Sequence, residues 1–245
     1  GAGATRYTKG SSMTPEALIT VARQALLTRR FEERIVKLSM EGRLPPTLHP
    51  GAGHELAQLA VLQALQSDDP IIYSHRGVAY MVGRGIPLVA MLCDMAGRYG
   101  STNNGKGGIM HVVDPARGVY GESGTLGGGL VVATGMALAL QKKRSANIVA
   151  HFFGDGGSNR GTFHESLNWA AVLKLPALFI CENNGWAVSV PTSRSTAVEN
   201  IADRAVAYGI PGHVVDGNDP EQVYAVIVEA AKRARAGLGP SLIEL

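Results

Sequence analysis

The sequence predicts an α/β fold in which a doubly wound, mainly parallel sheet carries helices on both faces. Short apolar runs rich in strand-forming residues, such as 148–153 and 177–182, alternate with longer segments of helical periodicity. Glycine-rich or polar turns follow these runs. Alternating strands and helices are typical of parallel sheets, because each parallel connection needs a crossover segment. At 245 residues, the chain is long enough to bury the core of such a domain.

The first half of the chain is predicted to be mainly helical. Its first helix begins where Thr14 can act as N-cap, with Pro15 at the first helical position and Glu16 in the first turn. The predicted elements of this half are a helix at 14–41, a loop at 44–53, a helix at 54–66, a strand at 71–73, a polar turn at 74–77, a helix at 88–98, an irregular glycine-rich stretch at 100–129 and a helix at 130–141.

The second half predicts a regular alternation of strands and helices. Its elements are a strand at 148–153, a helix after it, a strand at 177–182, a helix at 197–208, a strand at 213–215, a helix at 220–237 and a strand from 241. Residues 1–13 are expected to be a flexible leader, and residues 14–245 to form one domain.

Composition narrows the class of function. The formal charge of +3 is small, and the basic residues are mostly scattered, so nucleic acid is not an expected partner. The longest nearly uncharged apolar stretch, 127–140, is shorter than the ~20 residues that cross a bilayer, so no membrane association is expected. The only two cysteines, Cys93 and Cys181, give no disulfide framework, and the second is expected to be a buried, inert thiol. A cytoplasmic location is expected, or a mitochondrial matrix location if a transit peptide has been removed.

The most informative feature is a glycine-rich turn that precedes a strand ending in paired asparagines. Gly154-Asp155-Gly156 follows one predicted strand, and Asn183-Asn184 follows the next. Because the carboxyl ends of parallel strands lie at one edge of a sheet, these polar side chains should meet there. A carboxylate and an amide oxygen suit a hard divalent cation, and a glycine-rich turn suits a phosphate.

Two other phosphate-binding motifs fit less well. A dinucleotide fingerprint needs a glycine at position 159, where this chain has Asn159. Residues 100–106 nearly match a P-loop, but Gly107 stands where the hydroxyl that binds magnesium should be. The sequence therefore favours the site at Asp155 and Asn184.

The segment 154–193 resembles the thiamine diphosphate motif of the E1 α subunits of 2-oxo acid dehydrogenases, and the similarity extends over about 14–245. This resemblance implies thiamine diphosphate and Mg²⁺ as cofactors and an oxidoreductase function. It also implies that Asp155, Asn184 and the backbone carbonyl of Trp186 are the magnesium ligands. The fold expected from the resemblance is the thiamine diphosphate-binding α/β fold.

The resemblance assigns further roles one by one. His75 and Arg76 match a pair that contacts the diphosphate, and a planar guanidinium suits phosphate oxygens physically. Gly156 and Gly157 match the turn that contacts the diphosphate. Gly124 and Leu126 match positions beside the aminopyrimidine ring. His49 matches a histidine on the substrate side and is the expected catalytic residue.

The resemblance also implies partners. A β subunit should supply the glutamate that activates the aminopyrimidine, in an α₂β₂ assembly, and the acyl group of a small 2-oxo acid should pass to a lipoyl-bearing E2. Acetoin cleavage or another carboligation is an alternative, as is a non-catalytic subunit that retains the fold. Two departures stand out: Val78 replaces a histidine of many relatives, and the family's C-terminal continuation, including a diphosphate-binding histidine, is expected to be missing after Leu245.

Overall fold

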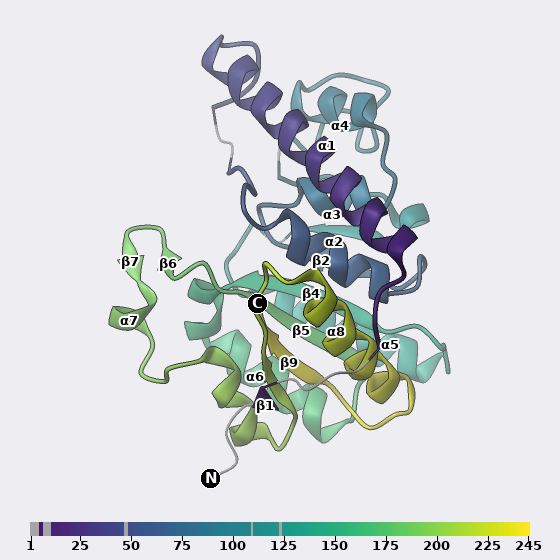
Figure 1. Ribbon diagram of the computed structural model, residues 1–245, viewed down its shortest axis with the longest axis vertical. Coiled ribbons are helices and arrows are strands. Elements are labelled where there is room, and N and C mark those ends of the chain that lie inside the picture. The colour runs from purple at the N-terminus through teal and green to yellow at the C-terminus, as the bar shows by residue number, and fades with distance from the viewer. Residues whose placement is uncertain (1–4, 7–10, 47–48, 109, 123) are drawn as a thin grey trace.

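The computed structural model describes residues 5–6, 11–46, 49–108, 110–122 and 124–245. Within these residues, seven strands form one sheet in the order β1-β8-β9-β5-β4-β2-β3. Every neighbouring pair in this sheet is parallel. The predicted α/β class is therefore confirmed, and the described sheet is parallel throughout (Figure 1).

The elements of the described residues follow the predicted alternation. The strands of the sheet are β1 (Thr5–Arg6), β2 (Ile71–Tyr73), β3 (Val119–Glu122), β4 (Val149–Gly154), β5 (Ala177–Glu182), β8 (Gly212–Val214) and β9 (Ser241–Glu244). The longer helices are α1 (Pro15–Met40), α2 (Glu55–Ala64), α3 (Val78–Gly83), α4 (Leu88–Met95), α5 (Gly128–Lys142), α6 (Gly161–Val172) and α8 (Pro220–Arg235). Short 3₁₀ helices occupy η1 (Pro115–Arg117), η2 (Asp155–Asn159) and η3 (Ile201–Tyr208).

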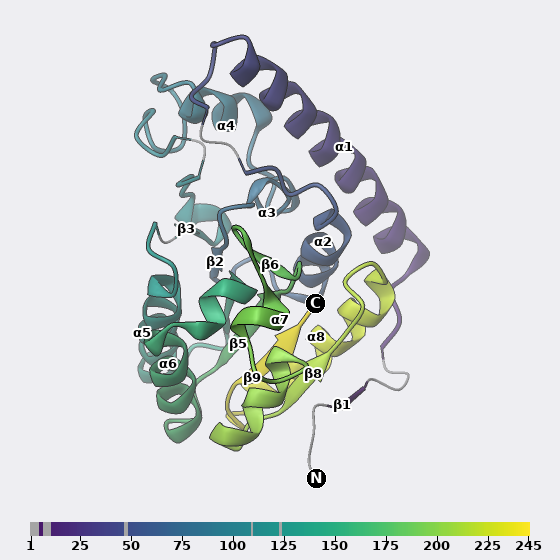
Figure 2. The same ribbon diagram turned by 90° about the vertical axis from the view of Figure 1, so that its left-hand side faces the viewer.

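Helices cover both faces of the sheet, because alternate residues of each strand point to opposite sides. Phe152 and Ile180 belong to a core shared with α1, α2, α3, α4 and α8. Phe153 and Phe179 belong to a second core, shared with α5, α6 and η3. Figure 2 shows these two helical layers on either side of the strands. The doubly wound arrangement is confirmed.

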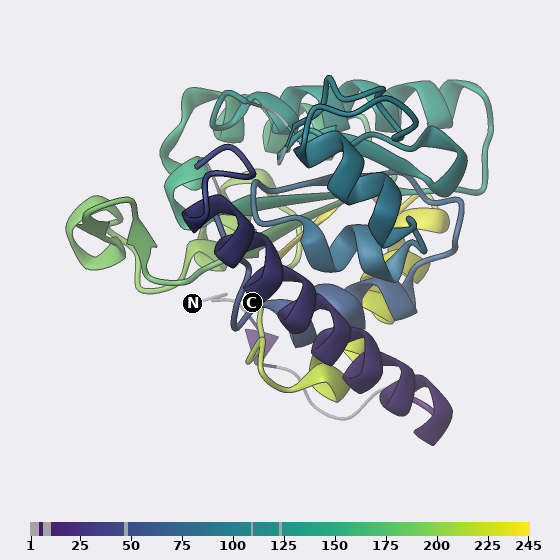
Figure 3. The same ribbon diagram turned by 90° about the horizontal axis from the view of Figure 1, so that it is seen from above.

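The chain reverses its direction of travel across the sheet near the middle strands. From β2 the chain proceeds to β3 at one edge, whereas from β4 it proceeds to β5 and on toward the other edge. Open parallel sheets bind ligands where such a reversal leaves a crevice beyond the carboxyl ends of the strands. The crevice here lies beyond the ends of β2 and β4. Figure 3, seen from above, shows α1 crossing in front of the other elements.

Several elements differ from the sequence prediction. Helix α3 was not predicted, because six residues are too few to reveal a helical period. Strand β3 lies in the stretch predicted to be irregular, where it pairs with β2. The predicted helix at 197–208 is the 3₁₀ helix η3. Within residues 1–13, Thr5 and Arg6 form the edge strand β1, which pairs with β8.

A small antiparallel hairpin projects from the body of the fold. It consists of β6 (Trp186–Ala187) and β7 (Val190–Pro191), followed by the one-turn helix α7 (Thr192–Ser195). Figure 1 shows it reaching away from the sheet beside the chain's central strands. At its turn, Val188 has a φ of 57°. A β-branched residue rarely adopts this left-handed conformation, and such strain is often found at functional sites.

Two simpler expectations concern the cysteines and the membrane. Cys181 is buried and has no disulfide partner, and its pKa is raised well above the ordinary value by burial and by nearby carboxylates. The expected burial of this thiol is confirmed. Of the helices in the described part of the chain, none combines the length and the apolar character that a bilayer span requires.

Candidate functional site

The residues predicted to form the site line one cleft at the reversal point of the sheet. The cleft consists of two adjoining hollows that share His49, Ser74, His75, Leu126, Gly154 and Val188. Gly124 and Gly157 line the first hollow. The second is lined by Arg76, Asp155, Gly156, Asn184 and Trp186. Positions from distant parts of the chain are therefore brought together as predicted.

Asp155 lies at the bottom of the cleft and is held firmly. It is 3% exposed and is the first residue of η2, directly after β4. Its Oδ2 accepts a hydrogen bond of 2.9 Å from the Thr192 hydroxyl, and its carbonyl oxygen accepts one of 2.7 Å from the Ser158 hydroxyl. Arg204 in turn donates to the carbonyl oxygen of Ser158. The Thr192 bond orients the Asp155 carboxylate, and the other two bonds hold the backbone of the turn.

Asn184 and Trp186 lie at the start of the projecting hairpin. The Asn184 Oδ1 accepts a hydrogen bond of 3.0 Å from the Trp186 backbone N–H, which forms a tight turn. Gly185 between them has a φ of 79°, a conformation that favours glycine. The turn brings Asn184 and Trp186 to the hollow that Asp155 lines from the end of β4.

The donor chemistry of this hollow fits a small, hard cation. A carboxylate, an amide oxygen and a backbone carbonyl are the oxygen ligands that Mg²⁺ prefers, with water and phosphate completing the octahedron. Softer metals would need nitrogen or sulfur ligands. Among the described residues, no group of three His, Cys, Asp or Glu side chains has a metal-binding arrangement. The proposed ligands include a single carboxylate. This agrees with a cation that is bound partly by the protein and partly by the oxygens of a phosphate.

The two glycines of the turn differ in how strictly the structure requires them. A Cβ atom on Gly156 would lie 2.8 Å from the Cβ of Ala187 in the hairpin, so a larger residue would push the hairpin away. A Cβ atom on Gly157 would meet the Phe153 ring at 3.5 Å, an ordinary contact. Packing thus requires glycine at position 156 but not at position 157.

Arg76 is half-buried just beyond β2. Its Nη1 donates a hydrogen bond of 2.5 Å to the Pro50 carbonyl oxygen, which ties it to the loop that carries His49. Among the described residues, no partner is found for its Nε or Nη2. The guanidinium therefore keeps donors available on the cleft side, as a phosphate ligand would need.

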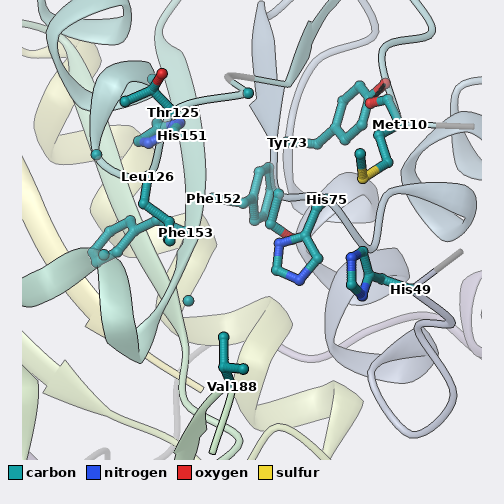
Figure 4. A pocket seen from close by; sticks show the side chains of 16 residues that line it. His49, Tyr73, His75, Met110, Thr125, Leu126, His151, Phe152, Phe153 and Val188 are labelled. Carbon is teal, nitrogen blue, oxygen red and sulfur yellow. Dashed lines mark hydrogen bonds between the residues drawn. The ribbon is translucent and has the colours of Figure 1, made fainter. Parts of the chain in front are cut away.

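His49 and His75 lie side by side in the middle of the cleft (Figure 4). Their ring centroids are 4.9 Å apart, and the rings are nearly perpendicular. Burial, together with the positive charge of Arg76, lowers the pKa of His75 to about 4. A pKa this low leaves His75 neutral at physiological pH. His49 and Leu126 are exposed on the open side of the cleft.

The structure adds residues that the sequence did not single out. Glu182, the last residue of β5, is 5% exposed in the wall of the cleft. It accepts hydrogen bonds from Ser74 and from Gln58 of α2. A glutamate at the end of an otherwise apolar strand, directly before Asn183-Asn184, was a signal that sequence reasoning could have used. Gln58 gave no such signal, because it lies in an ordinary helical pattern.

The segment that nearly matches a P-loop already encloses a carboxylate of this chain. Asp94, at 0% exposure, accepts hydrogen bonds from the hydroxyls of Ser101 and Thr102 and from the backbone N–H groups of Asn103 and Gly105. The loop is thus folded around an internal anion, which agrees with the sequence argument against a nucleotide site there.

The fold and the cleft place the chain among the open α/β proteins that bind ligands beyond the carboxyl ends of parallel strands. Comparison with known families identifies it further. The model of the dehydrogenase E1 component family matches residues 22–245. The chain belongs to this family, and the membership inferred from the sequence motifs is confirmed.

Similar proteins of known name include α subunits of two kinds. The chain is 42% identical to the α subunit of acetoin:2,6-dichlorophenolindophenol oxidoreductase from Bacillus subtilis over 236 residues, covering 96% of this chain and 71% of that one. A Cupriavidus necator subunit of the same name is 43% identical over 229 residues, which cover 94% of this chain and 69% of that subunit. The pyruvate dehydrogenase E1 component subunit α from Rhizobium meliloti is 35% identical over 223 residues, with coverage of 91% and 64%.

Solved structures support the fold class. A transketolase variant from Pichia stipitis aligns with a TM-score of 0.65 over 92% of this chain, at 20% sequence identity. An enzyme from Mycobacterium smegmatis described as thiamin diphosphate-dependent aligns with a TM-score of 0.52 over 81% of this chain, at 16% identity. The chain spans about a third of the length of each, at 36% and 34%. These similarities confirm the expected fold.

Proposed function

We propose that this chain is the α subunit of a thiamine diphosphate- and Mg²⁺-dependent E1 enzyme that decarboxylates a small 2-oxo acid and passes the acyl group to a lipoyl acceptor. The observation that carries this proposal is the meeting of Asp155, Asn184 and Arg76 in one hollow at the reversal point of the sheet. Those residues supply oxygen ligands for a cation and a guanidinium for a diphosphate. The family of the chain agrees with this use.

When bound, thiamine diphosphate supplies an electron sink for the carbanion that decarboxylation leaves. The residues of this chain have simpler tasks. Asp155, Asn184 and the Trp186 carbonyl would hold the cation, and Arg76 would hold the diphosphate. His49 lies on the open side, where it can hydrogen-bond a substrate or move a proton.

A β subunit would complete the active site, which we propose to lie within an α₂β₂ assembly. The open side of the cleft supports this, because Leu126 is 58% exposed and Val188 is 97% exposed. Apolar groups gathered at a cleft mouth commonly mark a surface that a partner covers. The partner would supply the glutamate that activates the aminopyrimidine.

Acetoin cleavage is a second candidate, favoured by the two acetoin-related α subunits at 42% and 43% identity. A panel of 2-oxo acids and acetoin, assayed with the chain and its β subunit, separates the two. Turnover of acetoin alone would replace the 2-oxo acid proposal, whereas turnover of 2-oxo acids alone would exclude the acetoin reading.

Calorimetric titration of the α–β pair with thiamine diphosphate, with and without Mg²⁺, tests the cofactor assignment. Binding should depend on Mg²⁺. Arg76→Ala should weaken thiamine diphosphate by ~10-fold or more and leave thiamine nearly unchanged, because a charged hydrogen bond contributes ~1.5–3 kcal/mol and only the diphosphate form offers phosphate oxygens. Equal losses for both ligands would contradict the role of Arg76, and no Mg²⁺-dependent heat in the wild type would contradict the cofactor assignment.

A further inference from the structure

A buried carboxylate lies behind the proposed diphosphate ligand, with the His54 Nδ1 3.8 Å from its Oε1. Glu182 ends β5 and is 5% exposed. A carboxylate at this depth is costly unless hydrogen bonds compensate for lost hydration. Glu182 has two such bonds on its two oxygens, and both lead to the segment that carries His75 and Arg76.

The first bond reaches the segment directly. The Ser74 hydroxyl donates to the Glu182 Oε2 at 2.6 Å. Ser74 directly follows β2 and directly precedes His75 and Arg76. The bond links the carboxyl ends of β2 and β5, which are separated in the sheet by β4. It therefore spans the cleft floor below the residues that are proposed to hold the diphosphate.

The second bond reaches the same segment through α2. The Gln58 Nε2 donates to the Glu182 Oε1 at 2.5 Å and to the Arg76 carbonyl oxygen at 3.2 Å. One amide group thus joins Glu182 to the backbone of Arg76. Gln58 is itself 1% exposed, so these bonds are shielded from water and retain more of their strength.

We infer that Glu182 is a positioning residue, which holds the backbone of Ser74 to Arg76 so that the Arg76 guanidinium faces the diphosphate. The inference rests on the proposed function, because it concerns how Arg76 meets its ligand. It predicts that Glu182 affects phosphate recognition mainly through Arg76, with a smaller part through His75 in the same segment.

A double-mutant cycle on the α–β pair tests this inference. The Kd values of thiamine diphosphate and of thiamine, both with Mg²⁺, are measured for the wild type, Glu182→Gln, Arg76→Ala and the double variant. Glu182→Gln should weaken thiamine diphosphate on the order of tenfold, as the loss of supporting hydrogen bonds behind a ligand typically does. Thiamine should change less than about twofold, since outer partners act through the group they orient. In the Arg76→Ala background, Glu182→Gln should have a much smaller effect, because only the contact of His75 then remains to be disturbed.

Glu244→Gln is the matched control. Glu244 is also 5% exposed and also ends a strand, β9, next to β5. It accepts hydrogen bonds from Asn183 and from the Ala202 N–H rather than from Ser74 or Gln58. The control should leave the ratio of the two Kd values unchanged, although it also removes a buried charge from this edge of the sheet.

The outcomes separate this inference from the proposed function. Additive losses in the double variant, or equal losses for thiamine and thiamine diphosphate, would overturn the positioning role. If the wild type bound no thiamine diphosphate, the cofactor assignment itself would fail. Ser74→Ala removes only one of the two bonds to Glu182 and serves as the test if Glu182→Gln does not fold. It should shift the ratio of the Kd values of thiamine diphosphate and thiamine in the same direction as Glu182→Gln. No shift in this ratio would overturn the inference.

Discussion

The floor and the rim of the cleft are built in different ways. The floor consists of the strand ends at residues 74–76, 154–157 and 182, where Asp155 and Glu182 are nearly fully buried and hydrogen-bonded. The rim consists of residues 49, 124–126 and 184–188, which loops and the projecting hairpin carry. In the rim, Trp186 and Val188 are 57% and 97% exposed.

This difference indicates a division of labour between the chain and its proposed partner. A preorganised floor can bind a charged group without first reordering itself, so it suits the diphosphate and the cation. The exposed rim suits the other end of the cofactor, where the β subunit would close the active site. The proposed cation joins the two regions, because Asp155 belongs to the floor, whereas Asn184 and Trp186 belong to the rim.

The largest effect is expected from the floor. Asp155→Ala removes the only carboxylate of the proposed cation site, so it should raise the Kd of thiamine diphosphate in Mg²⁺ by more than ~100-fold, beyond what loss of a supporting partner causes. Calorimetric titration of the α–β pair measures it. Asp68→Asn, which removes an exposed carboxylate elsewhere, should bind normally. An Asp155→Ala variant that kept Mg²⁺-dependent binding would show that the floor does not hold the cation.

A rim substitution should instead act on turnover. His49→Ala should lower kcat by on the order of 100-fold, as expected for loss of a group that moves a proton. The Kd of thiamine diphosphate should change by less than about twofold, because binding depends on the floor. Steady-state kinetics and titration on the same variant separate the two. If His49→Ala weakened binding as much as turnover, floor and rim would not be functionally distinct.

The sequence predicted the proposed cation ligands better than the residues that support the cleft floor. Asp155 and Asn184 could be placed together because each lies within two residues of the end of a recognisable parallel strand. The partners of Glu182 could not, since Ser74 and Gln58 are 108 and 124 residues away in sequence, and no local pattern encodes such contacts. Strand β3 was also missed, because its pairing with β2 rather than its own composition makes it a strand.

Glu32 links the loop of the rim to the body of the fold and should give a pH signature. It is 2% exposed on α1, and its Oε1 accepts a hydrogen bond of 2.9 Å from the Gly51 N–H. Among the described residues its Oε2 is buried without a partner. Burial raises the pKa of Glu32 to about 6, and the Gly51 bond only partly opposes this.

The sign of this effect follows from linkage. The pKa of Glu32 in the folded state lies above the ordinary value of 4.5, so folding favours the protonated carboxyl group. The stabilising contribution of protonated Glu32 is fully present below pH 4.5 and is lost as pH rises through about 6. Glu32→Gln should therefore be more stable than the wild type at pH 8, by up to about 2 kcal/mol, and should lose this advantage at pH 4.5. Urea unfolding at both pH values measures it. Glu33→Gln, at an exposed position of α1, is the control for the substitution itself.

The smallest effect should come from the hydrogen bond between the Thr192 side chain, which follows the hairpin, and the Asp155 side chain in the floor. Thr192→Val keeps the shape of the side chain and removes the hydroxyl that donates to the Asp155 Oδ2 at 2.9 Å. The backbone bond from the Thr192 N–H to the Gly185 carbonyl oxygen, at 2.8 Å, is retained, so the hairpin should keep its fold. Loss of one such hydrogen bond costs about 1 kcal/mol, which corresponds to a roughly fivefold rise in the Kd of Mg²⁺.

Thr196→Val is the control for this variant, because Thr196 lies just past the same helix α7, and its hydroxyl contacts Asn159 rather than Asp155. It should leave the Kd of Mg²⁺ unchanged. Titration of Mg²⁺ at a fixed, saturating concentration of thiamine diphosphate isolates the cation step. If Thr192→Val and Thr196→Val behaved alike, the hairpin would support the cation only through the backbone around Gly185, and the floor would hold the Asp155 carboxylate without help from the rim.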